Sequence, residues 1–257
     1  MTLETLLRLA LVPAAVWIAS VAARRWGHAM SGYLGGLPMI GGPITLFLAL
    51  DLGPGFAARS ALFTLAAIAA QGAHLLAFAF MARRGSWWLA LLSGWTAFAA
   101  VSVAITFVPL QPIVALVLAV GGLLTAWRFL PRERAGGGAP RIPAMELRLR
   151  LVAAFALAGL IIWSAPIFGP VVSGILLSVP VTGSIIPAFT LALYGNDALA
   201  RLLRGFVVGL SGFTAFFGAL AFTLGAWGIT AGFGCAVFLA LMAVFTVDRI
   251  ARHGSRA

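Results

Sequence analysis

Long apolar stretches fill this chain, and short polar segments separate them at regular intervals. Each stretch is long enough to cross roughly 30 Å of hydrocarbon as a helix, and no alternating barrel pattern occurs. The pattern therefore predicts an all-α integral membrane protein with about nine transmembrane helices. The expected spans are Leu6 to Val21, Gly32 to Leu52, Phe56 to Met81, Trp87 to Val108, Ile113 to Leu130, Leu151 to Ile167, Val171 to Tyr194, Leu202 to Leu224 and Trp227 to Val247.

The composition agrees with this prediction. Hydrophobic residues make up 62% of the chain and charged residues only 9%, so no water-soluble surface can be built from it. The single cysteine, Cys235, lies inside an apolar stretch and offers neither a disulfide framework nor a cysteine metal site. We expect Cys235 to be a small buried hydrophobic residue.

The chain also resembles itself at an offset of 142 positions, the separation of Glu4 from Glu146. A proline, several glycines and two arginines stay in register, which apolar composition alone does not explain. Paired halves built around apolar segments that glycine and proline interrupt are typical of transporters. The matching pairs include Arg8/Arg150, Gly32/Gly174, Pro38/Pro180, Gly41/Gly183, Gly53/Gly195 and Arg59/Arg201.

The arginines predict the orientation. With the amino terminus outside, fifteen arginines lie on the inner side and only Arg8 and Arg59 lie on the outer side. Cytoplasmic loops carry such an excess, so we expect a multi-pass protein of a bacterial-type inner (plasma) membrane with a cytoplasmic carboxyl terminus. Orientation and contact with the lipid bilayer account for the net charge of +11, and no nucleic-acid partner is expected.

In this orientation the matching halves run through the membrane in opposite directions. We therefore expect a 4+1+4 inverted repeat whose second and seventh helices are broken. Residues 1–110 form the first four-helix repeat, residues 111–145 form a linker helix and a cytoplasmic connector, and residues 146–257 form the second repeat. The glycines and prolines of Arg132 to Pro143 make that part of the connector unsuited to a packed element.

Two motifs of the second half carry a family resemblance. They are Ser173-Gly-Ile-Leu-Leu-Ser-Val-Pro180 and Gly195-Asn-Asp-Ala-Leu-Ala-Arg201. Together they resemble the small four-helix membrane proteins of the GlpM-like type, and the first half keeps Gly53 and Arg59 but lacks the Asn-Asp pair. The resemblance implies a fused, two-copy form of a protein that otherwise pairs with itself. It supports the architecture and defines no activity, and it leaves homo-oligomer formation open.

The two predicted breaks are the strongest candidates for function. Proline removes a backbone donor and disturbs the preceding turn, and backbone groups freed in this way are tolerated in a membrane only against protein or a polar cavity. Two interpretations remain open, a cavity between the breaks and close helix packing through small residues. We expect Gly41 and Gly183 at the closest approach. The prolines concerned are Pro38, Pro43, Pro180 and Pro187, and the nearby hydroxyls belong to Thr45, Thr182 and Ser184.

His74 and Gln71 lie one helical turn apart in the third span. A histidine at membrane depth suits a substrate or proton role, and a neutral histidine hydrogen-bonded to a neighbour explains the same residues. Asp51 and Asp197 are expected as interfacial caps or ion pairs, with gating as the alternative. Trp95 lies deep enough in its span to contact an apolar ligand.

The sequence lacks the paired carboxylates, zinc helix or Ser/His pair of a membrane enzyme, so no enzymatic activity, cofactor or metal is expected. We predict a secondary transporter, a permease or exporter of a small neutral or weakly acidic solute. The alternative is a non-transport membrane subunit or scaffold of a larger complex. The predicted substrate-binding residues are Pro38, Gly41, Gly42, Thr45, Gln71, His74, Trp95, Pro180, Thr182, Gly183 and Ser184.

Overall fold

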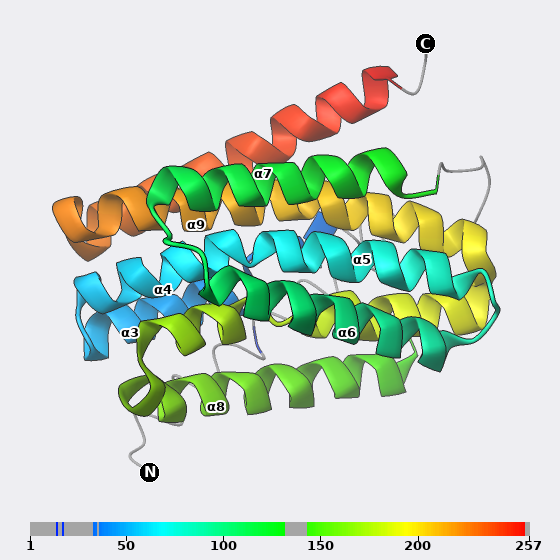
Figure 1. Ribbon diagram of the computed structural model, residues 1–257, viewed down its shortest axis with the longest axis horizontal. Helices are drawn as coiled ribbons and strands as arrows, with labels where there is room; N and C mark the ends of the chain where they lie inside the picture. The colour runs from blue at the N-terminus through cyan, green and yellow to red at the C-terminus, as the bar shows by residue number, and fades with distance from the viewer. Residues whose placement is uncertain (1–13, 15–16, 18–32, 35, 132–142, 255–257) are drawn as a thin grey trace.

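The computed structural model describes residues 14, 17, 33–34, 36–131 and 143–254. Every element with described bounds is an α-helix, and no strand occurs in these ranges, which confirms the predicted all-α class. The expected first span and nearly all of the connector lie outside the described residues. The helices, labelled as in Figure 1, are α3 (Gly41–Asp51), α4 (Pro54–Ala66), α5 (Ile68–Ala82), α6 (Trp87–Thr106), α7 (Pro112–Phe129), α8 (Ala144–Leu177) and α9 (Val181–Gly254).

Within the described part of the chain, four helical regions are long and apolar enough to cross a membrane. The first joins α4 and α5 across Ala67, where the helical hydrogen bonds continue on both sides of a single turn residue. The last contains α8 and most of α9. The four regions are Pro54–Ala82, Trp87–Thr106, Pro112–Phe129 and Ala144–Ile250.

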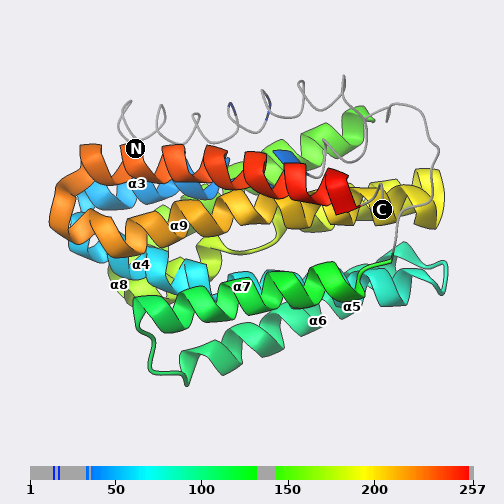
Figure 2. The same cartoon turned by 90° about the horizontal axis from the view of Figure 1, so that it is seen from above.

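Glycines divide the two longest helices. Gly169 in α8 and both Gly195 and Gly228 in α9 have φ between 73° and 75°, a left-handed region that side chains with a Cβ disfavour. The helix axis therefore changes direction at each of these glycines, and each following helical segment packs back along the bundle (Figures 1 and 2). Gly53, directly before α4, has a φ of 89° and produces the same kind of change between α3 and α4.

The helix α4 lies in the interior of the bundle, where it contacts α3, α7, α8 and α9. Large apolar side chains such as Ile44, Leu65, Phe217 and Leu220 are fully buried around it. Close helix approach depends on small residues, because a Cβ added at Gly72 would lie 2.8 Å from the carbonyl oxygen of Gly122 in α7. Such contacts through small residues are typical of membrane helix bundles.

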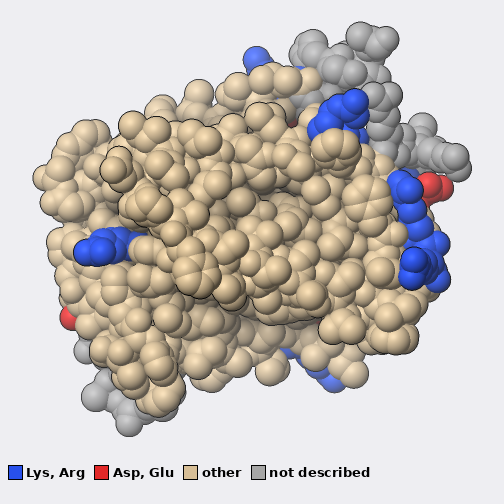
Figure 3. All heavy atoms as spheres, viewed as in Figure 1, with Lys and Arg blue, Asp and Glu red and all other residues tan. Residues whose placement is uncertain are grey.

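Charged groups lie mainly at the two ends of the molecule. The middle of the face seen in Figure 3 carries no charged side chain, and basic groups gather at its right-hand end. Large hydrophobic side chains, among them Phe107, Trp163 and Phe238, are exposed on the outside of the bundle. A surface of this kind suits contact with lipid, and the apolar helices indicate a membrane-spanning protein.

Candidate functional site

The first helix break lies directly before α3. Residues 33, 34 and 36 are helical, residues 37–40 are not, and the helix resumes at Gly41. Inside the break the N–H of Met39 donates to the carbonyl of Leu37 at 2.8 Å, which closes a three-residue turn around Pro38. The chain is thus non-helical at Pro38, as the sequence predicts, while α3 continues through Pro43.

The second break separates α8 from α9 and consists of residues 178–180. The N–H of Val181 donates to the carbonyl of Val179 at 2.8 Å, which closes the same kind of turn around Pro180. The hydroxyl of Ser178 donates to the carbonyl of Ile175, one of the last carbonyls of α8. As at the first break, the helix continues through the later proline, Pro187.

Side chains from α5 satisfy carbonyl groups at the second break. The Gln71 amide Nε2 donates to the carbonyl of Ser178 at 2.8 Å, and His74 Nε2 donates to the carbonyl of Gly183 at 3.1 Å. In a regular helix the N–H of residue 187 would bond to the Gly183 carbonyl, but Pro187 has no N–H. The imidazole replaces that missing donor. The predicted His74 and Gln71 pair therefore makes hydrogen bonds to the backbone at the second predicted break.

The helical segment before each break packs against a helix from the other half of the chain. A Cβ added at Gly36 would lie 2.6 Å from the Phe206 carbonyl oxygen in α9, and one added at Gly209 would lie 2.3 Å from the Tyr33 carbonyl oxygen. Likewise, a Cβ added at Gly174 would lie 2.4 Å from the Ser60 carbonyl oxygen in α4. Thr64 Oγ1 donates to the carbonyls of both Ser60 and Gly174, and these contacts fix α8 against α4.

Aromatic side chains of α9 cover the first turn of α3. A Cβ added at Gly41 would lie 3.0 Å from Phe217 Cζ and 3.7 Å from the Leu177 carbonyl oxygen, and one added at Gly42 would lie 3.5 Å from Phe216 Cζ. Gly183 has no α3 atom within 4 Å of an added Cβ. The expected closest approach of Gly41 and Gly183 is therefore wrong: Gly41 meets the end of α8 instead, because the aromatic rings occupy the space beside it.

A cavity lies between the two breaks. It is small, with about 60 Å³ of space for the centres of water-sized molecules. Residues from both breaks and from α5, α8 and α9 form its wall. They are Leu34, Gly36, Leu37, Met39, Ile40, Gly41, Gln71, Leu75, Arg150, Leu157, Leu177, Val179, Pro180, Val181, Thr182, Gly183, Phe206, Leu210 and Phe213.

Five of the predicted site residues line this cavity: Gly41, Gln71, Pro180, Thr182 and Gly183. The other six, Pro38, Gly42, Thr45, His74, Trp95 and Ser184, do not.

Thr45 and Trp95, two of these six, make contacts outside the cavity. Thr45 is fully buried, and its hydroxyl donates to the carbonyl of Gly41 in its own helix. Trp95 packs in a T-shaped arrangement with the His74 ring, with centroids 6.3 Å apart, and is partly exposed.

Arg150 is a charged cavity residue that the sequence did not predict. Counted as a cytoplasmic loop arginine, it is instead 3% exposed, lies in the second turn of α8 and forms part of the cavity wall. Its guanidinium forms an ion pair with Glu146, one turn earlier and also buried. The spacing of these residues and their match to Glu4 and Arg8 in the other half were signals for a structural role.

The expected interfacial aspartates stay away from the cavity. Asp51 and Asp197 are both exposed, and each lies two residues from a positive-φ glycine, Gly53 or Gly195. Among the described residues, no group of three His, Cys, Asp or Glu side chains comes together as a metal site. No protein-family model, curated protein or solved structure matches this chain.

Proposed function

We propose that the chain is a secondary transporter whose solute binds in the cavity between the two breaks. In this proposal it has nine transmembrane helices arranged as a 4+1+4 inverted repeat, and Gly169, Gly195 and Gly228 divide α8 and α9 into separate spans. Broken helices that meet at a pseudo-two-fold axis are typical of such transporters. The observation that carries the proposal is the cavity that both breaks line.

The backbone conformation of the two breaks supports the repeat. Both contain a three-residue turn around proline, at Pro38 and at Pro180, positions that the repeat aligns. The next aligned glycines, Gly53 and Gly195, both have positive φ, at 89° and 75°. A chance similarity among apolar residues would not place the same turn and the same unusual conformation at matching positions.

The packing of the helices also supports the inverted repeat. The segment before the first break contacts α9 around Gly209, and the segment before the second contacts α4 around Ser60. Each broken helix therefore packs against the span that follows the other broken helix. A reciprocal exchange of this kind is expected of two halves related by an axis through the cavity.

The two halves contribute different chemistry to the cavity region. Gln71 and His74 of the first half correspond to Phe213 and Phe216 of the second. Polar side chains therefore satisfy carbonyls at the second break, and aromatic rings cover the first. A wall with a polar side and an apolar side suits an amphipathic solute.

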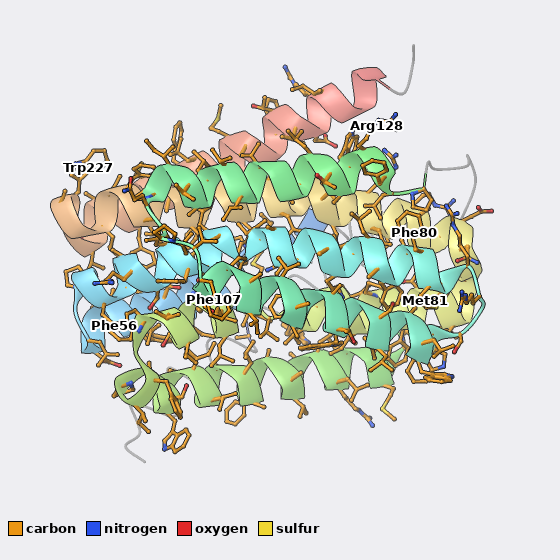
Figure 4. The ribbon with its side chains drawn as sticks, viewed as in Figure 1. Phe56, Phe80, Met81, Phe107, Arg128 and Trp227 are labelled. Carbon is orange, nitrogen blue, oxygen red and sulfur yellow. The ribbon has the colours of Figure 1, made fainter. Side chains whose placement is uncertain are left out.

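The basic end of the molecule favours the predicted orientation. Arg128, Phe80 and Met81 lie at one end of the bundle and Phe56, Phe107 and Trp227 at the other (Figure 4). In our proposal the Arg128 end faces the cytoplasm.

The alternative, a non-transport subunit or scaffold, predicts breaks that never open to both sides.

Labelling of single cysteines distinguishes the two functions. Met39→Cys and Val181→Cys place thiols at corresponding positions of the cavity wall, and Cys235→Ala removes the natural cysteine. We expect a membrane-impermeant maleimide to label both thiols in right-side-out and in inside-out vesicles, because the cavity opens to each side in turn. Leu203→Cys, buried in the core, is the unlabelled control. Labelling from only one side, or from neither, would reject the transporter.

A further inference from the structure

Gln71 contributes a hydrogen-bond acceptor to the cavity. The residue lies in α5, is 8% exposed and forms part of the cavity wall. Its Nε2 donates to the carbonyl of Ser178, and because a carbonyl can only accept, this bond fixes which end of the amide is the nitrogen. The other end, Oε1, makes no hydrogen bond with any residue that the structure describes. A buried polar atom without a partner is unusual and indicates a missing donor.

Thr182 provides a second polar group. It lies in the first turn of α9, lines the cavity, and its hydroxyl makes no hydrogen bond with the described part of the chain. Thr45 and Thr64, in contrast, each donate to the carbonyl four residues earlier in their own helix. The carbonyl four residues before Thr182 belongs to Ser178 and already accepts from Gln71. The Thr182 hydroxyl is therefore available to a solute as donor or as acceptor.

The cavity wall offers no uncompensated charge to an ion. Among the described residues that line it, Arg150 is the single ionisable one, and its guanidinium forms an ion pair with the buried Glu146. Most of the remaining wall is apolar and includes Leu75, Leu157 and Phe206. An ion that entered the cavity would lose its hydration without an opposite charge to replace it, which is costly. The wall therefore favours an uncharged solute.

We propose that the cavity binds a small uncharged molecule that donates an N–H or O–H hydrogen bond to Gln71 Oε1, accepts one from the Thr182 hydroxyl and packs a short carbon chain against the apolar wall. Short-chain primary amides and alcohols have this chemistry, whereas a carboxylate presents only acceptors. A single water needs about 10–15 Å³ of probe space, so the cavity holds roughly four to six waters or one organic molecule of similar size. This inference rests on the proposed transport function and specifies its substrate class.

Matched probes test the requirement for a donor. In the Cys235→Ala background, Met39→Cys places one thiol in the cavity wall, and its reaction with a neutral maleimide is timed in the presence of each probe. Butyramide and 2-pentanone have nearly the same shape, but only the amide donates. Butyramide should halve the rate at about a tenfold lower concentration, because the ketone leaves the buried Gln71 oxygen without a donor. Butan-1-ol should likewise protect better than its isomer methyl propyl ether, and butyrate should not protect.

Variants of the two polar residues identify the source of the preference. Gln71→Met keeps a similar shape without the amide and should remove the difference between butyramide and 2-pentanone. Thr182→Val should weaken protection by both probes about equally, because each presents a carbonyl oxygen to the hydroxyl. Thr45→Val removes a hydroxyl that bonds within its own helix and should leave protection unchanged. Since Gln71→Met also leaves the Ser178 carbonyl without its donor, the matched probes in the parent protein decide the matter if that variant does not fold.

The outcomes separate the substrate class from the transport function. Equal protection within both matched pairs, or protection by butyrate as strong as that by butyramide, would overturn the substrate class. An amide preference that persists in a folded Gln71→Met protein would overturn the role of Gln71. If a membrane-impermeant maleimide labels the Met39→Cys thiol from one side only or from neither, the transport function itself is rejected. Labelling from both sides without a preference for donors rejects the substrate class alone.

Discussion

His74 Nε2 lies 3.1 Å from the carbonyl oxygen of Gly183, across the interface between α5 and the start of α9. The residue whose N–H would normally bond to this oxygen is Pro187. A side chain from the first half of the molecule thereby replaces a backbone donor that proline removes from the second half. This contact assigns His74 a defined structural role at the edge of the cavity.

A double-mutant cycle between His74 and Pro187 tests that role. His74→Ala should lower the stability of the purified protein by about 1–3 kcal/mol, because it leaves a buried carbonyl without a donor. Pro187→Ala restores the N–H of residue 187, so the double variant should recover about 1 kcal/mol of this loss. Thermal unfolding of the four proteins in detergent gives the coupling energy.

Pro166→Ala is the matched control for that cycle. Pro166 also lies inside a helix, but its substitution supplies no donor to Gly183. Its effect should add to that of His74→Ala without coupling. Equal coupling of His74 to both prolines would show that the imidazole does not replace the Pro187 donor.

Alanine substitutions at two glycines of α8 should differ sharply in their effect on the stability of the protein. Gly174→Ala in α8 places a Cβ 2.4 Å from the Ser60 carbonyl oxygen and should cost about 1–3 kcal/mol through overpacking. Gly159→Ala, in the same helix, meets no atom within 4 Å and should be neutral or stabilising by up to about 1 kcal/mol. Similar melting temperatures for the two variants would contradict the close packing of α8 on α4.

The corresponding turns before α4 and within α9 should respond equally to substitution. Gly53→Ala and Gly195→Ala each force a side chain into positive φ, which costs about 1–2 kcal/mol. Gly55→Ala, in open space without positive φ, is the control and should cost less than either. A loss of stability at only one of the two aligned glycines, measured by thermal unfolding, would contradict a repeated backbone.

Much of the fold and part of the site could be predicted from sequence. Apolar stretches predict helices of membrane-spanning length, and proline chemistry predicts the interruptions at Pro38 and Pro180. Side-chain direction is harder to predict, because it depends on which helices become neighbours. Thr45 bonds back to its own helix, and Trp95 packs against the His74 ring and does not line the cavity.

Arg150 was missed for a different reason. The positive-inside rule counts arginines near span ends and treats each as a loop residue. The rule does not distinguish an exposed arginine from a buried arginine that forms an ion pair with a carboxylate one helical turn away. Glu146 at that spacing is the local signal, and the recurrence of the pair as Glu4 and Arg8 makes the signal stronger.

The orientation is open to a direct test. Reporter fusions after Arg84, after Gly136 and at Ala257 should all report the cytoplasm, because the arginine-rich segments are predicted to stay inside. A fusion after Phe107, at the opposite end of the bundle in Figure 4, should report the outside. A reporter outside the cytoplasm after Gly136 would rule out the inverted arrangement of the halves.

The central claim is that the two breaks share one solute site, and an experimental structure with native small molecules retained tests it most directly. The protein would be extracted into lipid nanodiscs without a detergent wash and imaged by electron cryomicroscopy. We predict density between the Pro38 and Pro180 turns that contacts Gln71, Thr182 and Gly183. Breaks packed directly against each other, with side chains filling the space between them and no solute, would contradict the account.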